Sequence, residues 1–214
     1  MSKNGTQLGK FISFEGGEGT GKSTQVRILS ERLNESGLKT FCTREPGGTA
    51  LAEEIRNILV RGERGKCDPY SETLLHFAAR RNHLVKKIWP ALQDGTWVIC
   101  DRFTDSSMAY QGMAMEVGES TIKTLSKLFI EQFSPNLTFI MDLKVEEALR
   151  RTEGRVDGED RYESMGLTFH DKVRKAFLDI AAKETNRCVV IDSMQSVERI
   201  STQIMALVEQ RFEI

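Results

Sequence analysis

A glycine-rich segment near the start of the chain has the composition and spacing of a phosphate-binding loop. Residues 16–23 read Gly-Gly-Glu-Gly-Thr-Gly-Lys-Ser and match the pattern G-x-x-x-x-G-K-[ST]. Glycines let backbone N–H groups point inward onto a phosphate, and a following helix N-terminus adds positive partial charge. In this pattern Lys22 reaches the β- and γ-phosphates and Ser23 ligates Mg²⁺. The segment therefore predicts ATP and Mg²⁺ as ligands, with nucleotide-binding residues Gly16, Gly17, Glu18, Gly19, Thr20, Gly21, Lys22, Ser23 and Thr24.

A nucleotide-binding loop does not by itself define a reaction. The chain has no Asn-Lys-x-Asp segment, which a regulatory GTPase needs to recognise guanine. Motor and DNA-repair ATPases are usually longer than 214 residues. A nucleotide-switched binding protein without a small acceptor stays open as an alternative, and it predicts hydrolysis that no acceptor stimulates.

A second set of polar residues follows the apolar run at 96–100. Asp101 is placed to hold Mg²⁺ through water or to orient an acceptor, and it is the second predicted metal-binding residue beside Ser23. Arg102 offers a planar fork of donors that suits a phosphate monoester. These residues predict a kinase whose acceptor carries a phosphate.

Two blocks of sequence resemble the thymidylate kinase family. Residues 101–112 fit D-R-F-x-x-S-x-x-A-Y-Q-G, and residues 43–49 read T-R-E-P-G-G-T. The order of the segments resembles that family from residue 10 to the C-terminus. The resemblance implies in-line transfer of the ATP γ-phosphoryl group to dTMP, giving dTDP for dTTP synthesis. The nearest alternative is a P-loop kinase for another nucleoside monophosphate or a deoxynucleoside.

The resemblance also implies roles for individual residues. Glu18 matches the carboxylate that contacts the sugar 3′-hydroxyl, and Tyr110 matches the tyrosine that crowds the 2′ position. Arg102 and Arg56 match arginines near the acceptor phosphate. Further cleft residues match as well: Arg44, beside the same site, and Ser107 and Gln111, which face the thymine edge.

An aromatic-x-x-x-Arg pair on a helix grips the base in this family. Residues four apart share one helix face. Alignment on downstream residues favours Arg80 as the base-reading arginine, with His76 at the stacking position where Phe is usual. Phe77 paired with Arg81 is the alternative, so the stacking residue stays open between His76 and Phe77.

The charged stretch at about 150–163 is typical of a mobile lid. Phosphoryl transfer needs positive charge where the γ-phosphoryl group leaves. Gly19 occupies the loop position where some members of the family carry arginine, so this chain resembles the bacterial type that supplies the charge from the lid. Arg155 is the first candidate for a catalytic arginine, followed by Arg151 and Arg161.

Alternating apolar and helical patterns predict the elements that position these residues. Strands are expected at 10–15, 38–43, 96–100, 137–143 and 188–192, and helices at about 23–37, 51–59, 70–93, 122–133, 169–183 and 197–212. We expect a kink or break before Pro90. The pattern predicts an α/β P-loop kinase fold with a five-stranded parallel sheet and helices on both faces. Residues 1–9 are expected to be a flexible tail and 10–214 one domain.

Bulk composition limits the partners. With a net charge of −1, the chain has no field that would attract DNA or an anionic membrane. No stretch approaches the length of about 20 apolar residues that spans a bilayer. The cysteines lack zinc spacing, which predicts a reducing cytoplasm. The family resemblance implies a homodimer.

Overall fold

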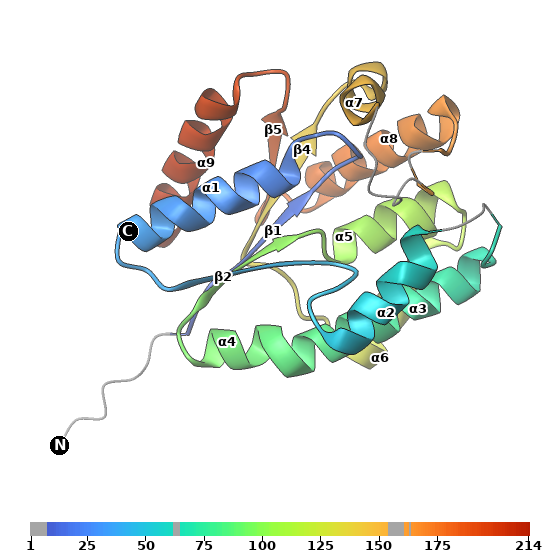
Figure 1. Cartoon of the computed structure of the whole chain (residues 1–214), viewed down its shortest axis with the longest axis horizontal. Helices are drawn as coiled ribbons and strands as arrows, with labels where there is room; N and C mark the ends of the chain where they lie inside the picture. Colours follow the sequence, from blue (N-terminus) through green and yellow to red (C-terminus); the bar gives the residue numbers. More distant parts are fainter. Residues whose placement is uncertain (1–7, 62–64, 154–160, 163) are drawn as a thin grey trace.

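The computed structural model describes residues 8–61, 65–153, 161–162 and 164–214. Within these residues a parallel sheet runs through the centre of the molecule (Figure 1). Its strands are β1 (Phe11–Glu15), β2 (Thr40–Arg44), β3 (Trp97–Asp101), β4 (Leu137–Asp142) and β5 (Cys188–Asp192). Their order across the sheet is β2-β3-β1-β4-β5. This arrangement confirms the predicted five-stranded parallel sheet.

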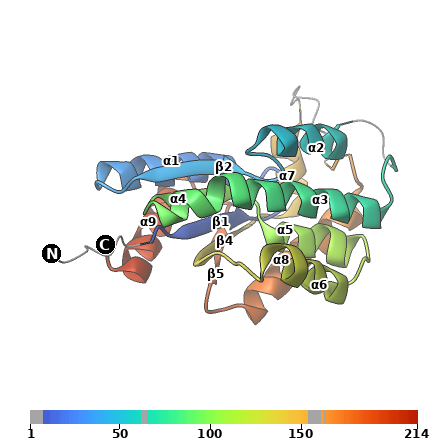
Figure 2. The same cartoon turned by 90° about the horizontal axis from the view of Figure 1, so that it is seen from below.

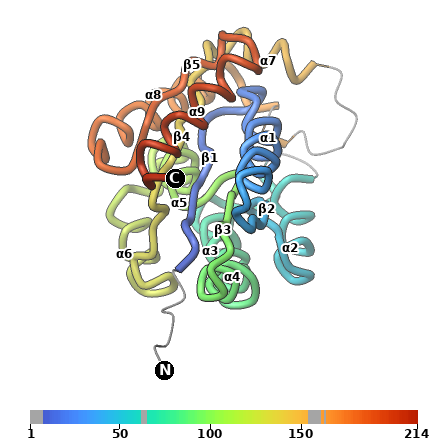
Figure 3. Tube along the Cα trace, turned by 90° about the vertical axis from the view of Figure 1, so that its left-hand side faces the viewer, coloured from blue at the N-terminus to red at the C-terminus, as the bar shows by residue number. Residues whose placement is uncertain are grey.

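Helices cover both faces of the sheet (Figures 2 and 3). Side chains alternate along β1, so Ile12 and Phe14 lie in one core and Phe11 lies in another. Helices α1 (Lys22–Glu35) and α9 (Val197–Phe212) pack on the first face. Helix α8 (Leu167–Lys183) and the helical turns η1 (Leu84–Ile88) and η2 (Met108–Ala114) pack on the second face. The strands β1, β3 and β4 are buried along almost their whole length and are mostly apolar, whereas β2 is partly exposed.

The other helices connect the strands in chain order. They are α2 (Ala50–Val60), α3 (Pro69–His83), η1 (Leu84–Ile88), α4 (Trp89–Gln93), α5 (Thr104–Ser107), η2 (Met108–Ala114), α6 (Glu119–Ile130), α7 (Val145–Thr152) and α8 (Leu167–Lys183). The start of α3 shows why the sequence folds this way locally. Asp68 Oδ1 accepts hydrogen bonds from the backbone N–H groups of Tyr70 and Ser71, and Pro69 occupies the first turn.

The segment before Pro90 stays helical. There η1 is a π-helical turn, in which the N–H of Trp89 donates to the carbonyl of Leu84. The predicted break before Pro90 does not occur, because α3, η1 and α4 follow one another without a gap. Arg150 and Arg151, expected in a lid, lie in the last turn of helix α7.

Polar residues end the strands at one edge of the sheet. The register places Arg44 beside Asp101 and Asp142 beside Asp192, and Glu15 ends the central strand. In parallel sheets the carboxyl ends of all strands meet at one edge, where ligands bind. The sheet thus brings together residues that are far apart in the sequence.

Candidate active site

A cleft of about 320 Å³ lies at the carboxyl edge of the sheet. It joins the phosphate-binding loop to the segment that follows β3 and to α3. Its lining includes most of the residues predicted from the sequence: Glu18, Gly19, Thr20, Gly21, Lys22, Ser23, Thr24, Arg44, Arg56, His76, Arg80, Asp101, Arg102, Ser107, Tyr110 and Gln111. Gly16 and Gly17, at the start of the loop, line a separate small cavity together with residues of α7 and α8.

The phosphate-binding loop requires glycine where the chain passes close to its neighbours. Gly16 and Gly19 have φ values of 133° and 69°, in the region that favours glycine. A Cβ atom on Gly16 would lie 2.5 Å from the carbonyl oxygen of Met141, and one on Gly19 would lie 2.1 Å from that of Ala148. The loop therefore keeps its curl only with glycine at these two positions.

Lys22 and Ser23 sit at the start of α1 and face the loop. Lys22 Nζ donates to the carbonyl of Gly17 at 2.6 Å and to that of Gly16 at 3.2 Å. Burial, and next the charge of Arg102, lowers the pKa of Lys22 to about 8. Ser23 Oγ donates to Asp101 Oδ2 at 2.5 Å. The lysine and the serine hydroxyl thus lie at neighbouring positions, and the Asp101 carboxylate at the end of β3 bonds to that hydroxyl.

Arg102 connects the loop to the segment after β3. Its Nη1 donates to the carbonyl of Gly16 at 2.8 Å and to Ser106 Oγ at 3.0 Å. Its Nη2 donates to Glu18 Oε1 at 2.7 Å and to Tyr110 OH at 3.3 Å. The backbone φ of Arg102 is 68°, a costly conformation for a residue with a Cβ. These contacts fix a guanidinium group beside the phosphate-binding loop.

Glu15 supports the turn that contains Arg102. From the sequence alone, we could predict only that Glu15 ends a strand. This fully buried carboxyl group accepts from the backbone N–H of Phe103 at 2.7 Å and from Ser106 Oγ at 2.5 Å. Burial, and then Asp105, raises the pKa of Glu15. Because Ser106 also accepts from Arg102, Glu15 helps to hold the turn in which Arg102 lies.

Glu18 is a charged partner of this arginine. Burial alone would raise its pKa, but Arg102 and Lys22 outweigh that effect and lower the pKa of Glu18 to about 2. Tyr110 OH also donates to its Oε1 at 3.0 Å. The negative charge of this acid in the phosphate-binding loop is thereby balanced by the positive charges of Arg102 and Lys22.

The Glu18→Gln variant is expected to lose stability in a pH-dependent way. Because the folded pKa lies below the ordinary 4.5, ionised Glu18 stabilises the fold above pH 4.5, and this contribution disappears as the pH falls toward 2. We expect a deficit of about 1 to 3 kcal/mol at pH 7. Urea unfolding between pH 7 and 3.5 should show the gap to wild type closing. The control Glu31→Gln, at an exposed ion pair with Arg27, should change little; a pH-independent gap would contradict the assignment.

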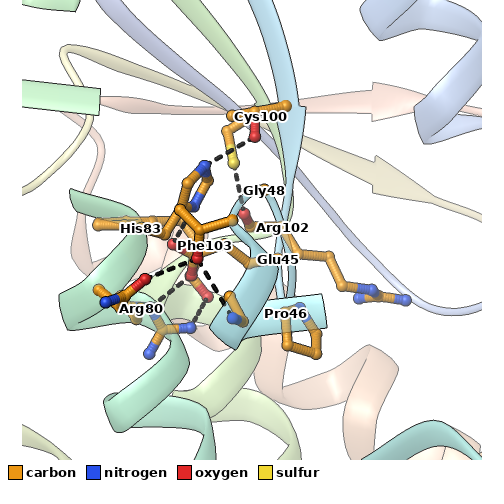
Figure 4. A network of polar contacts seen from close by, with 12 residues as sticks. Glu45, Pro46, Gly48, Arg80, His83, Cys100, Arg102 and Phe103 are labelled. Carbon is orange, nitrogen blue, oxygen red and sulfur yellow. Dashed lines mark hydrogen bonds and ion pairs between the residues drawn. The ribbon is translucent and has the colours of Figure 1, made fainter. Parts of the chain in front are cut away.

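A buried network positions Arg80 at the other end of the cleft (Figure 4). Arg80 Nε donates to Glu45 Oε2 at 2.6 Å, Nη1 to Ser107 Oγ at 3.0 Å and Nη2 to the carbonyl of Phe103 at 3.0 Å. His83, which is fully buried, donates from Nδ1 to the other oxygen of Glu45 at 3.1 Å. Glu45 lies in the T-R-E-P-G-G-T block, but its role could not be predicted, because its partners Arg80 and His83 are 35 and 38 residues away.

The two candidate stacking residues lie in different places. His76 borders the cleft, and its Nε2 lies 3.1 Å from Tyr162 OH. Burial, followed by the surrounding arginines, lowers the pKa of His76 to about 3. Phe77 packs in the core with Val117, away from the cleft. Arg81 donates to the carbonyl of Phe129 outside the cleft.

Glu72 is a cleft-supporting residue that sequence reasoning missed. It is buried on α3 and accepts from Gln111 Nε2 at 2.9 Å and from Tyr162 OH at 2.8 Å. Arg161 pairs with its other oxygen and donates to the carbonyl of Leu59. The one feature of the sequence that could have indicated Glu72 is a charged residue on the buried face of a predicted helix. Arg161 is thus engaged at this end of the cleft rather than at the phosphate-binding loop.

The remaining predicted arginines are spread around the site. Arg44 pairs with Glu53 at 3.2 Å, and Arg56 donates to the carbonyl of Pro46 at 2.9 Å. Arg151 donates to the carbonyl of Ser193 at 3.1 Å. Arg155, with the rest of the 154–160 segment, lies outside the described residues.

The chain is similar to known proteins over most of its length. The family described as Thymidylate kinase matches residues 14–204. The thymidylate kinase of Caulobacter vibrioides is 46% identical over 95% of this chain and 97% of its own length. That of Nitrobacter hamburgensis is 44% identical, over 98% and 92%. The crystal structure of thymidylate kinase from Ehrlichia chaffeensis has a TM-score of 0.75 at 36% identity and covers 94% of this chain and 99% of that one.

Proposed function

The chain belongs to the thymidylate kinase family, and we propose that its cleft transfers the γ-phosphoryl group of ATP to dTMP, giving dTDP. The chain is a nucleoside monophosphate kinase and thus a transferase. The observation that carries the proposal is the joint lining of one cleft by the phosphate-binding loop and Arg102, with Arg102 bonded to Glu18 of that loop. A donor site and an acceptor site thereby share one space.

The donor end suits ATP with Mg²⁺. Lys22 lies where it can bind the β- and γ-phosphates, and the hydroxyl of Ser23 and the carboxylate of Asp101 are oxygen ligands that Mg²⁺ prefers. In the described part of the chain, no cluster of three or more His, Cys, Asp or Glu could hold a metal. This fits Mg²⁺, which is usually bound by one or two protein groups plus phosphates and water. When bound, the ion neutralises charge on the phosphates.

Arg102 is proposed to hold the acceptor phosphate, with Arg56 and Arg44 nearby. The phosphate oxygen of dTMP is already anionic, so no strong general base is needed. Positioning and electrostatic stabilisation then account for most of the rate. Arg155 and Arg151 remain our proposed sources of positive charge at the transferred group. Arg161 is the third candidate, and in that role it would have to leave its pair with Glu72.

Recognition of the nucleoside is proposed for the residues beyond Arg102. Glu18 would accept from the 3′-hydroxyl, and Tyr110, bonded to Glu18, would crowd a 2′-hydroxyl. At the base end, Arg80 and His76 both border the cleft, with Ser107 beside them. These positions favour His76 over Phe77 as the residue against the thymine ring.

Measurement of ADP release from ATP–Mg²⁺ in the presence of single nucleoside monophosphates tests the proposed function. We expect strong stimulation by dTMP, weaker stimulation by dUMP and dCMP, and the weakest by UMP. Stimulation by a different monophosphate would indicate another kinase of this class. Hydrolysis insensitive to every monophosphate in a folded sample would favour a nucleotide-switched binding protein.

We further propose a cytoplasmic enzyme without nucleic-acid partners. The described cysteines are all free thiols, as a reducing compartment favours. Among the described residues, no helix is long and apolar enough to cross a bilayer.

A homodimer is proposed on the face formed by α2, α3, η1 and α6. An apolar groove of about 390 Å³ lies there, and its lining includes Leu51, Leu74, Phe77, Val85 and Phe129. Four of these side chains are exposed, Leu74 to 54%. Exposed apolar surface of this kind marks interaction sites.

The Leu74→Glu variant should therefore convert a dimer into a monomer. A buried charge at the centre of an apolar interface without a partner is strongly unfavourable. Light scattering after size-exclusion chromatography should give twice the chain mass for wild type and the mass of one chain for the variant. Leu167→Glu, equally exposed at the start of α8, serves as the control and should remain dimeric. Unchanged mass in Leu74→Glu would place the interface elsewhere.

A further inference from the structure

A buried carboxylate on α3 organises the base end of the cleft. Glu72 is 1% exposed, and three side chains from outside its helix bond to it. Gln111 and Tyr162 donate to Oε1 at 2.9 and 2.8 Å, and Arg161 pairs with Oε2. None of the reactions assigned to the cleft uses Glu72 directly. Its contacts instead fix the groups that border the cleft.

The first fixed group is the side-chain amide of Gln111. A carboxylate paired with a guanidinium group is only an acceptor. Gln111 must therefore turn its NH₂ group toward Glu72, as the 2.9 Å contact shows. The carbonyl oxygen at the other end of the amide is then the acceptor that a ligand meets.

The second fixed group is the imidazole of His76. Tyr162 donates its hydroxyl hydrogen to Glu72, so its oxygen can accept from His76 Nε2 at 3.1 Å. The ring is neutral because burial, and then nearby arginines such as Arg80, lowers its pKa to about 3. A neutral ring with hydrogen on Nε2 leaves Nδ1 as an acceptor.

We propose that Glu72 is a positioning residue that selects the base by turning the amide oxygen of Gln111 toward the end of the cleft, while through Tyr162 it holds the ring of His76 in one tautomer. A hydrogen-bond acceptor at this position favours a pyrimidine whose ring N3 carries hydrogen, as in thymine. It disfavours cytosine, whose N3 is itself an acceptor. Buried polar groups left unpaired give strong discrimination. This inference rests on the proposed function, because it places the base at this end of the cleft.

The Glu72→Gln variant tests the selection directly. An amide at position 72 can donate, so Gln111 is free to reverse. We expect kcat/KM for dTMP to fall about tenfold and the preference for dTMP over dCMP to fall by a similar factor, through KM for the monophosphate, with KM for ATP unchanged. Thr73→Val changes a buried neighbour whose hydroxyl donates to the carbonyl of Pro69 in its own helix, and it should retain the wild-type preference. An unchanged dTMP preference in folded Glu72→Gln would overturn the proposal.

A second measurement does not depend on substrate or on the stability of that variant. Tyr162→Phe keeps the Glu72–Arg161 pair and removes only the hydroxyl that joins Glu72 to His76. Long-range ¹H–¹⁵N NMR distinguishes the tautomers, and the chain has only three histidines to assign. We expect hydrogen on Nε2 of His76 in wild type and a mixture of tautomers in Tyr162→Phe. Hydrogen on Nδ1 in wild type would refute the assignment even if dTMP is the substrate, while loss of dTMP activity in wild type would refute the function alone.

Discussion

Replacing Lys22 with Met is expected to lower kcat about 10²–10³-fold, the range found when one electrostatic donor is removed from a transition-state site. In phosphoryl transfer the protein contributes mainly position and charge, so loss of the loop lysine has few substitutes. Met retains the apolar stem of a side chain that is only 6% exposed. Steady-state ADP release at saturating ATP and dTMP measures the change.

Binding of dTMP should survive this substitution. Lys22 Nζ bonds to the carbonyls of Gly16 and Gly17. In the proposed function, dTMP is bound instead by Arg102 and Arg80. Titration with dTMP should therefore give a dissociation constant close to wild type. Lys39→Met is a matched control, because Lys39 pairs with Asp94 on the surface and is expected to leave kcat unchanged. A Lys22→Met enzyme within tenfold of wild type would remove Lys22 from the transition state.

Much of the fold follows from local patterns in the sequence. The strand at 188–192 and the helix at 197–212 have the predicted bounds, since apolar period and capping residues mark them clearly. The short α5 and η2 were not predicted. Segments of four and seven residues show too little periodicity. The π-turn before Pro90 depends on a hydrogen bond that shifts by one residue, which composition does not encode.

The residues of the site also fall into those that the sequence predicts and those that it does not. Residues of the phosphate-binding loop and of the segment after β3 carry spacing that chemistry requires, and the structure gathers them in one cleft. Glu72 lies in no such motif, and the motif that contains Glu45 does not reveal its role, because these acids bond to partners between 35 and 90 residues away. Only the three-dimensional structure shows that these acids hold Arg80 and Gln111. The role of Arg161 stays a prediction for a related reason: a charged segment does not reveal that a buried acid, Glu72, pairs with this arginine.

The Arg80→Met variant should lower the free energy of unfolding by about 3–5 kcal/mol, the cost of leaving one partner of a buried ion pair without the other. Arg80 is 2% exposed, and its loss removes the bonds to Glu45, Ser107 and the carbonyl of Phe103. His83 alone then faces Glu45. Differential scanning calorimetry should show a fall in Tm of roughly 6–20 °C for a chain of this size.

Arg81→Met is the matched control, because it changes the next residue in the same way. Arg81 is 42% exposed and bonds to Glu131 and the carbonyl of Phe129 on the surface, so we expect a loss below about 1 kcal/mol. The same pair of variants separates the two alignments that the sequence left open. If Arg80 reads the base, Arg80→Met raises KM for dTMP at a temperature where the variant is folded, and Arg81→Met does not. The reverse pattern would assign base recognition to Arg81 and leave Arg80 with a purely structural role, since its buried bonds explain the stability loss in either case.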